Sequence, residues 1–328
     1  MINVHFNNIR FQILNELENA QKSILVAVYW FTNHELFNIL LEKLNDGLAV
    51  QLIIHNDYIN NRDTGLSFQY LIDKGCKLYF SDENNPMHNK FCIIDEKVLI
   101  NGSYNWTYYA ESKNRENILI IKEENPVILA FKNEFARLND LAEPLRTIKN
   151  LTRFEVDENN LLRNRDYLAH DIVYQAKAIN KPEIVQKAFE IAPNNLSVQQ
   201  TAYDLNLIKK YKLKHSVGVS IVNDGVKLMA KKGDSIPATF STIVRTSYSN
   251  QTKSVSDVVY GESNKATTNT TLVKMTLDGI PEKPTGKAEV KFTFSIDIEG
   301  KLRIEMMSLD NGKKEIDTQN AKWLIEET

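Results

Sequence analysis

Apolar runs and helical patterns alternate over the first 142 residues of the chain. Two runs rich in Val and Ile, at residues 24–31 and 50–55, are typical of strands covered on both faces. Between them, apolar residues recur at helical spacing from Leu36 to Leu44, after Thr32-Asn33 and before Gly47. The pattern predicts an α/β domain with a mixed sheet over residues 1–142. The expected strands are 24–31, 50–55, 77–80, 91–94, 98–100 and 116–122, and the expected helices are 36–44, 65–74 and 126–141.

The pattern changes after residue 142. Residues 143–212 predict three short helices, at 167–177, 183–191 and 197–211, which we interpret as a helical connector. Short strands with turn signals follow from residue 213, and strict alternation from Val290 to Asp297 is typical of a half-buried strand. We therefore expect an all-β sandwich over residues 213–328, with a short helix beginning near Asn320.

Composition and charge exclude several classes of protein but do not identify the function. The hydrophobic fraction is 42% and the charged fraction 25%, which are ordinary values for a globular protein. The longest apolar run, residues 23–31, is too short to span a bilayer, and no signal peptide is evident, so we expect a cytoplasmic protein. Cys76 and Cys92 are too few for a disulfide framework or a four-cysteine zinc site. The net charge of −2 means that a polyanionic partner needs a local basic site.

One segment carries residues suited to chemistry on a phosphate diester. His88 and Lys90 are two positions apart at the start of an apolar strand, so their side chains share one face. An imidazole can be neutral and nucleophilic at neutral pH, while an ammonium stabilises charge on phosphate oxygens in the transition state. Ser103 and Asn105 supply a hydroxyl and an amide, and Glu116 opens the next strand, from which a carboxylate could fix the imidazole tautomer.

These residues form the pattern His-x-Lys-(x)4-Asp-(x)6-Gly-Ser-x-Asn, which resembles the signature of the phospholipase D superfamily. The resemblance covers about residues 5–140 and is similar to small bacterial endonucleases with one motif per chain. It implies that His88 is the nucleophile, that Lys90 and Asn105 hold the phosphate with support from Ser103, and that Glu116 orients His88. It also implies that the Asp of the pattern, Asp95, is structural.

The same resemblance implies an assembly and a substrate class. The superfamily mechanism uses two motifs, so one motif per chain implies a homodimer through the N-terminal domain, with two His88 residues facing each other. No metal and no cofactor are implied. The implied substrate is DNA or RNA, and the alternative is a phospholipid diester, without integral membrane association. We interpret the other five histidines as structural or exposed: His5, His34, His55, His170 and His215.

The second half resembles the β-sandwich substrate-binding domain of the seventy-kilodalton heat-shock chaperones. The residues that carry the resemblance include Ile236-Pro237, Val259-Tyr-Gly-Glu262, Leu277-Asp-Gly-Ile-Pro281 and Phe292-Thr-Phe-Ser-Ile-Asp297. Neither the ATPase domain nor the helical lid of that family is expected here. The resemblance implies a groove for an extended polypeptide, in which serines replace part of the aliphatic lining. The implied lining is Val219, Val222, Val244, Ser247, Ser254 and Ser256.

The combined expectation is a multidomain α/β and all-β protein. It is a metal-independent phosphodiesterase, an endonuclease that works through a covalent phosphohistidine, with a chaperone-like sandwich as its targeting or regulatory module. The architecture suggests a role in restriction or phage defence. Two alternatives stay open: a phospholipid-hydrolysing enzyme, and a non-catalytic polypeptide-binding adaptor in which the phospholipase D-like domain is a dimerising scaffold.

Overall fold

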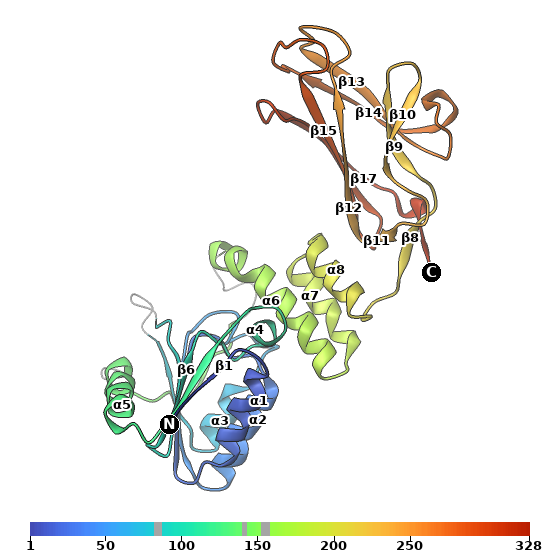
Figure 1. Ribbon diagram of the computed structural model, residues 1–328. Helices are drawn as coiled ribbons and strands as arrows, with labels where there is room; N and C mark the ends of the chain where they lie inside the picture. Colours follow the sequence, from blue (N-terminus) through green and yellow to red (C-terminus); the bar gives the residue numbers. More distant parts are fainter. Residues whose placement is uncertain (82–86, 140–142, 152–157) are drawn as a thin grey trace. The chain divides into compact units, whose positions relative to one another are not determined.

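The computed structural model describes residues 1–81, 87–139, 143–151 and 158–328 (Figure 1). The chain forms two compact units, Met1–Ile191 and Ala192–Thr328. Within the described ranges, no helix combines the length and the apolar character needed to cross a membrane.

The first unit is built on a mixed sheet, as predicted, and the sheet has seven strands, one more than the six expected. Parallel pairing joins β2 to β3 and β3 to β4, whereas all other neighbours are antiparallel. In spatial order the strands are β1 (Ile2–His5), β7 (Ile118–Lys122), β6 (Val98–Gly102), β5 (Lys90–Ile94), β2 (Ser23–Val28), β3 (Ala49–Ile54) and β4 (Lys77–Phe80).

Helices cover both faces of this sheet (Figure 1). One face packs against α1 (Ile9–Glu18), α2 (His34–Asn45) and α3 (Phe68–Asp73), and the other against α5 (Asn125–Asn139). Alternate residues of one strand supply the two cores. In β2, for example, Val26 belongs to the first core and Ala27 to the second.

The remaining helices divide between the two units. The first unit contains α4 (Tyr108–Ser112), α6 (Glu158–Ala178), the 3-10 helix η1 (Pro182–Ile184) and α7 (Val185–Ile191), whereas α8 (Leu196–Asp204) belongs to the second. The helix expected over residues 197–211 ends early because Asn206 adopts a left-handed φ of 56°. The Leu207 N–H then donates to the Ala202 carbonyl (3.0 Å), which terminates the helix in a Schellman turn.

The second unit is an antiparallel β-sandwich, as predicted. Alternate residues of β15 are buried between the sheets, including Phe292 and Phe294. The expected C-terminal helix is limited to one 3-10 turn, η3 (Lys322–Leu324), before β18 (Ile325–Glu327). One sheet is β10 (Gly225–Ala230), β9 (Val217–Ile221), β13 (Lys253–Tyr260) and β14 (Thr270–Asp278). The other is β12 (Ala238–Arg245), β15 (Glu289–Ile296), β16 (Lys301–Ser308) and β17 (Lys314–Asn320), and a small third sheet joins β11 (Ser235–Ile236), β8 (Tyr211–Leu213) and β18. The 3-10 helix η2 (Ala266–Thr268) precedes β14.

Candidate active site

Strand register brings the residues of the motif to one end of the seven-stranded sheet. The antiparallel pairing of β5 with β2 places Lys90 opposite Val28, the last residue of β2. The pairing of β6 with β7 places Gly102 opposite Ile118, and Glu116 lies two residues before that strand. This is also the carboxyl end of the parallel strands β2, β3 and β4, where open α/β sheets place their sites.

His88 and Lys90 are in direct contact. The Lys90 Nζ atom lies 3.1 Å from His88 Nδ1 and donates a hydrogen bond to the His88 carbonyl at 2.7 Å. The lysine is buried, with 9% of its surface exposed, whereas the imidazole is exposed. A charged ammonium can only donate, so in this geometry Nδ1 accepts and the neutral imidazole carries its proton on Nε2.

The surroundings of this pair lower the pKa values of both side chains. Burial, and then the neighbouring Lys90 charge, hold the pKa of His88 below its ordinary value. Burial lowers the pKa of Lys90 to about 8, and the Glu116 carboxylate opposes that shift. At pH 7 the imidazole is therefore mainly neutral while the ammonium is still mainly charged.

Ser103 and Glu116 are linked through a tight loop after β6. The Ser103 hydroxyl donates to Glu116 Oε2 and accepts from the Asn117 N–H at 3.2 Å, while Asn114 Nδ2 donates to Glu116 Oε1 at 2.8 Å. A side chain at Gly102 would place its Cβ 2.0 Å from the Asn117 carbonyl oxygen, so only glycine allows this approach. Within the described chain, Glu116 makes no hydrogen bond to His88.

The Asn105 amide is oriented by the segment that follows β2. Asn105 is buried, and its Oδ1 accepts a hydrogen bond from the Trp30 N–H at 3.2 Å. Because Oδ1 is engaged, Nδ2 is the group of this amide that can donate to a phosphate oxygen.

Asp95 has the structural position expected for it. It lies at the β5–β6 turn with a left-handed φ of 53°. Its carboxylate accepts the N–H groups of Gln21 (2.8 Å), Lys22 (2.7 Å) and Ser23 (2.9 Å). Partial burial opposes the shift, but these three hydrogen bonds lower the pKa of Asp95. The carboxylate therefore ties the hairpin to the start of β2.

Aromatic residues complete the site, and sequence reasoning did not assign them a role. The Tyr29 ring lies 4.8 Å from the His88 ring, and Lys90 Nζ lies 5.6 Å from its centroid. His55, predicted to be structural or exposed, stacks on the Tyr29 ring with a centroid distance of 4.6 Å. Trp30 Nε1 donates to Asp57 at 2.7 Å. Their positions in the sequence could have indicated a place at the site, since Tyr29 directly follows β2 and His55 directly follows β3.

Comparison with known proteins matches each half of the chain to a family. Residues 13–139 match the family model described as "Cardiolipin synthase, PLD-like domain", and residues 174–328 match the model described as "Hsp70 protein". The chain joins a phospholipase D-like domain to an Hsp70-family segment.

Relatives of the phospholipase D-like domain cover only part of the chain. "Mitochondrial cardiolipin hydrolase" of Chlamydomonas reinhardtii is 30% identical over 40% of this chain and 57% of its own length. The protein of the same name from Xenopus laevis is 31% identical over 43% of this chain and 65% of its own length. Among solved structures, Nuc of Salmonella typhimurium, a phospholipase D family member, is 22% identical with a TM-score of 0.42, and covers 45% of this chain and 99% of its own.

The Hsp70-family segment contains a groove of about 660 Å³ between the ends of its strands. Five of the six residues expected to line it do so: Val222, Val244, Ser247, Ser254 and Ser256. Val219 does not line the groove. It is fully buried in the core between the sheets, because alternation along β9 turns Ser220, and not Val219, toward the groove.

Proposed function

We propose that this chain is a phosphodiesterase that cleaves nucleic acid through a covalent phosphohistidine on His88. The observation that carries the proposal is the contact between a largely neutral imidazole and a buried ammonium, whose nitrogens lie 3.1 Å apart. In this arrangement Lys90 and Asn105 bind the phosphate oxygens, and Ser103 supports them. No metal is required, because these side chains supply both the nucleophile and the charge stabilisation.

The proposed reaction has two displacement steps. Nδ1, the unprotonated nitrogen of His88, attacks phosphorus as the Lys90 ammonium moves from it to a phosphate oxygen; a P–N bond forms, and one P–O ester bond breaks while the leaving oxygen takes a proton from a second, protonated imidazole. Water then attacks phosphorus, gives a proton to that second imidazole, and the P–N bond breaks. The products are an alcohol and a phosphomonoester, and both histidines return to their first state.

The second imidazole has to come from another copy of the chain. His88 is the one histidine of the motif, and no hydrogen bond or ring contact joins His55 to His88 within the described residues, although both contact the Tyr29 ring. Glu116 does not contact His88 of its own chain, and Lys90 holds the imidazole in the Nε2–H form. We therefore infer a homodimer through the N-terminal domain, in which the partner's His88 is the general acid and the partner's Glu116 orients the nucleophile.

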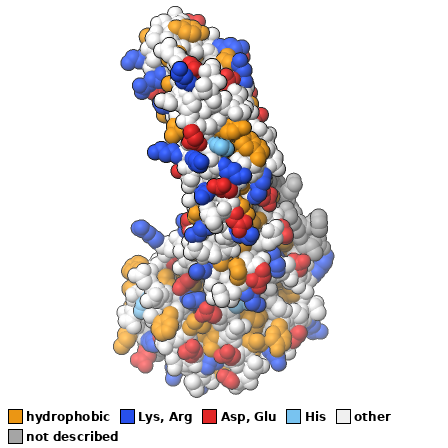
Figure 2. Space-filling view, turned by 90° about the vertical axis from the view of Figure 1, so that its right-hand side faces the viewer, with side chains coloured by type: hydrophobic (Ala, Val, Ile, Leu, Met, Phe, Trp, Pro, Cys, Tyr) orange, Lys and Arg blue, Asp and Glu red, His pale blue; other side chains and the backbone are white. Residues whose placement is uncertain are grey.

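The surroundings of the site favour a polynucleotide. Tyr29, Trp30 and Tyr109 are half-buried rings, and partly exposed rings beside a phosphate site can stack on bases. Lys113 and Arg115 are exposed in the loop before Glu116 and provide local positive charge. On the face of the molecule in Figure 2, basic and acidic side chains are interspersed, so this local site matters more than a general basic surface.

A lipid diester is the second candidate. Two observations favour it: the relatives described above are named cardiolipin hydrolases, and a 27% identical relative from Rickettsia typhi is named "Phospholipase D". These relatives share the domain with this chain over less than two thirds of their own length. The two candidates share the His88 chemistry and differ in what binds beside it.

One assay separates the candidates. Wild-type protein, His88→Ala and the control variant His215→Ala are incubated with plasmid, single-stranded DNA, RNA and cardiolipin vesicles, all in EDTA. We expect wild type and His215→Ala to degrade nucleic acid and His88→Ala to spare it. Cleavage of cardiolipin alone would establish the lipid candidate. Loss of activity in EDTA, or equal activity of His88→Ala, would refute the proposed mechanism.

The Hsp70-family segment is proposed as the targeting or regulatory module of this enzyme. Its groove is lined by apolar residues, including Val222 and Val244, and by polar ones, including Ser254 and Ser256, which suits an extended polypeptide with both apolar and polar side chains. A peptide array probed with wild type and with Val244→Glu tests this role. We expect the variant to lose the bound peptides, and binding that is unchanged by Val244→Glu would exclude the groove.

A further inference from the structure

Helix α6 lies outside residues 13–139, the part matched to the phospholipase D-like model, yet it packs against α4. α4 begins three residues after Asn105. The apolar face of α6 is well buried, including Leu168, Ile172 and Val173. The helix is therefore a fixed part of the first unit, and its polar side chains that face α4 have definite positions.

Tyr167 is the first of these side chains. Its hydroxyl lies 2.6 Å from the Thr107 hydroxyl, and Thr107 caps α4 by accepting the Ala110 N–H at 3.1 Å. The Tyr167 ring lies 4.5 Å from Trp30 and 4.4 Å from Tyr109. One side chain of α6 thus contacts both segments that border the phosphate site.

Asp171, one turn further along α6, is the second. It is fully buried, and its Oδ1 accepts the Tyr109 N–H at 2.8 Å. Burying a carboxylate is costly unless it is hydrogen-bonded, and an acceptor is favourable at the first turn of a helix, where the N–H groups have no partners within the helix. The carboxylate therefore binds the start of α4 to α6.

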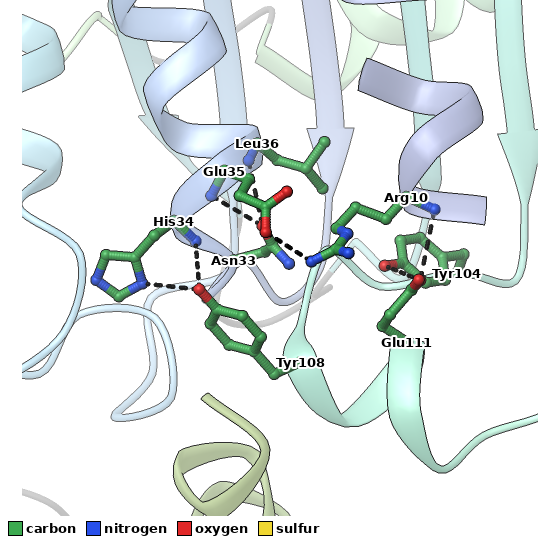
Figure 3. A network of polar contacts seen from close by, with 8 residues as sticks. All are labelled: Arg10, Asn33, His34, Glu35, Leu36, Tyr104, Tyr108 and Glu111. Carbon is green, nitrogen blue, oxygen red and sulfur yellow. Dashed lines mark hydrogen bonds and ion pairs between the residues drawn. The ribbon is translucent and has the colours of Figure 1, made fainter. Parts of the chain in front are cut away.

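The opposite side of the same segment is anchored by α1 and α2 (Figure 3). The Tyr108 hydroxyl accepts the His34 N–H at 3.2 Å, and the Tyr104 hydroxyl donates to Glu111 at 3.0 Å. Glu111 also accepts the Arg10 N–H at 3.4 Å. Residues 104–111 are thus held between the helices of the sheet face and α6, and α6 supplies one of the two supports.

The contacts continue from α6 to the reacting groups. The Trp30 ring lies 5.1 Å from Tyr29, and the Tyr29 ring lies 4.8 Å from His88. The Trp30 N–H also fixes the Asn105 amide at 3.2 Å. One residue, Trp30, therefore connects Tyr167 to Asn105 through direct contacts. Two residues, Trp30 and Tyr29, connect Tyr167 to His88.

We propose that Tyr167 and Asp171 are positioning residues for the phosphodiester site, so that the working site extends beyond the phospholipase D-like domain into α6. The expected loss of kcat rests on the proposed function, whereas the expected effect on the position of His88 does not. Tyr167 holds Trp30 and the α4 cap in place, and through them the Asn105 amide and the Tyr29–His88 contact. Asp171 fixes the N-terminus of α4 against the same helix.

The test uses the full chain with three variants at these two positions and one control. Tyr167→Leu removes the ring and the hydroxyl, Tyr167→Phe removes only the hydroxyl, and Asp171→Asn weakens the acceptor. Asp166→Ala, an exposed position of the same helix, is the matched control. Turnover is measured on bis(4-nitrophenyl) phosphate, and the His88 imidazole resonance is followed by NMR as a function of pH without substrate.

We expect Tyr167→Leu to lower kcat about 30-fold with little change in KM, because misplacing an oriented group by about 1 Å can cost up to 100-fold. Tyr167→Phe should lower kcat about 3-fold and Asp171→Asn about 10-fold. Asp166→Ala should leave kcat unchanged. The His88 resonance should shift in the Leu variant. Folded Tyr167→Leu and Tyr167→Phe with wild-type kcat and an unchanged His88 resonance would overturn the proposal. If wild type cleaves no diester, the proposed function fails, and the His88 resonance still decides the positioning role.

Discussion

The phosphate site and the groove of the Hsp70-family segment differ in whether their polar side chains are hydrogen-bonded within the chain. At the site, the polar groups of Lys90, Asn105 and Ser103 contact other polar groups of the chain, so each is held in one orientation. In the groove, the hydroxyls of Ser254 and Ser256 have no hydrogen bond within the described chain, and Val222 is 61% exposed. Chemistry requires groups whose orientation is fixed in advance. A groove that accepts several partners can leave its polar groups for the ligand to pair.

Replacing the nucleophile tests the first half of this comparison with the largest expected effect. His88→Ala should lower kcat by at least about 10⁴-fold, because no other group can form the P–N bond. His55→Ala removes the imidazole that stacks on Tyr29 within the same chain. It should lower kcat only about 5-fold, since packing alone is affected. Steady-state kinetics on one diester measures both variants. Similar losses for the two would show that the site does not depend on one oriented imidazole.

Stability should depend on the carboxylate that ties the hairpin to β2. Asp95→Ala leaves three N–H groups without their acceptor and should lower the free energy of unfolding by about 2 kcal/mol. Since the folded-state pKa of Asp95 is lowered, its contribution is present above the unfolded pKa and is lost as pH falls through the folded value. Urea unfolding at pH 7 and pH 3 measures this. An equal difference between wild type and Asp95→Ala at both values would contradict the structural role.

The pH dependence tests the tuning of the catalytic pair. The value of kcat/KM should rise as His88 loses its proton below pH 6.5, and fall as Lys90 deprotonates with a pKa of about 8. At pH 9 the loss relative to the maximum should be about 10-fold. Lys90→Arg keeps its charge and should lose the basic limb while retaining part of the activity. A basic limb that is unchanged in Lys90→Arg would assign it to another group.

The smallest expected effect is on peptide binding by the groove. Ser256→Val replaces a buried hydroxyl of the lining with an apolar group and should tighten binding of an apolar heptapeptide about 5-fold. Ser235→Val, at an exposed position of β11 that does not line the groove, is the control. Fluorescence anisotropy of a labelled peptide measures the affinity. Weaker binding in Ser256→Val would show that the serine is a direct contact of the ligand.

Residues that are close in the sequence were the most predictable. The spacing of His88, Lys90, Ser103 and Asn105 depends on one hairpin, and the mixed sheet follows from continuous apolar runs. Strand β1 and helix α1 were not predicted, because three of the four residues of β1 are exposed and the N-cap of α1 makes no side-chain hydrogen bond. The roles of Tyr29 and His55 depend on contacts between separate strands, which local patterns do not contain.

Tyr167 was the least predictable part of the site. It contacts Trp30, which lies 137 positions earlier, and Thr107, which lies 60 positions earlier. The helix itself was expected over residues 167–177, but nothing in its periodicity shows which element it packs against. The same limit explains Val219, since the register of β9 against β13 decides which of its faces is covered.

The central claim is that His88 forms the covalent intermediate, and one measurement tests it directly. Wild-type protein is mixed with bis(4-nitrophenyl) phosphate in EDTA, quenched in alkali within milliseconds, digested, and analysed by mass spectrometry. We expect a nitrophenyl-phosphoryl adduct on the peptide that contains His88, and none in His88→Ala. Hydrolysis that proceeds with the adduct on another residue, or with no adduct on His88, would contradict this mechanism.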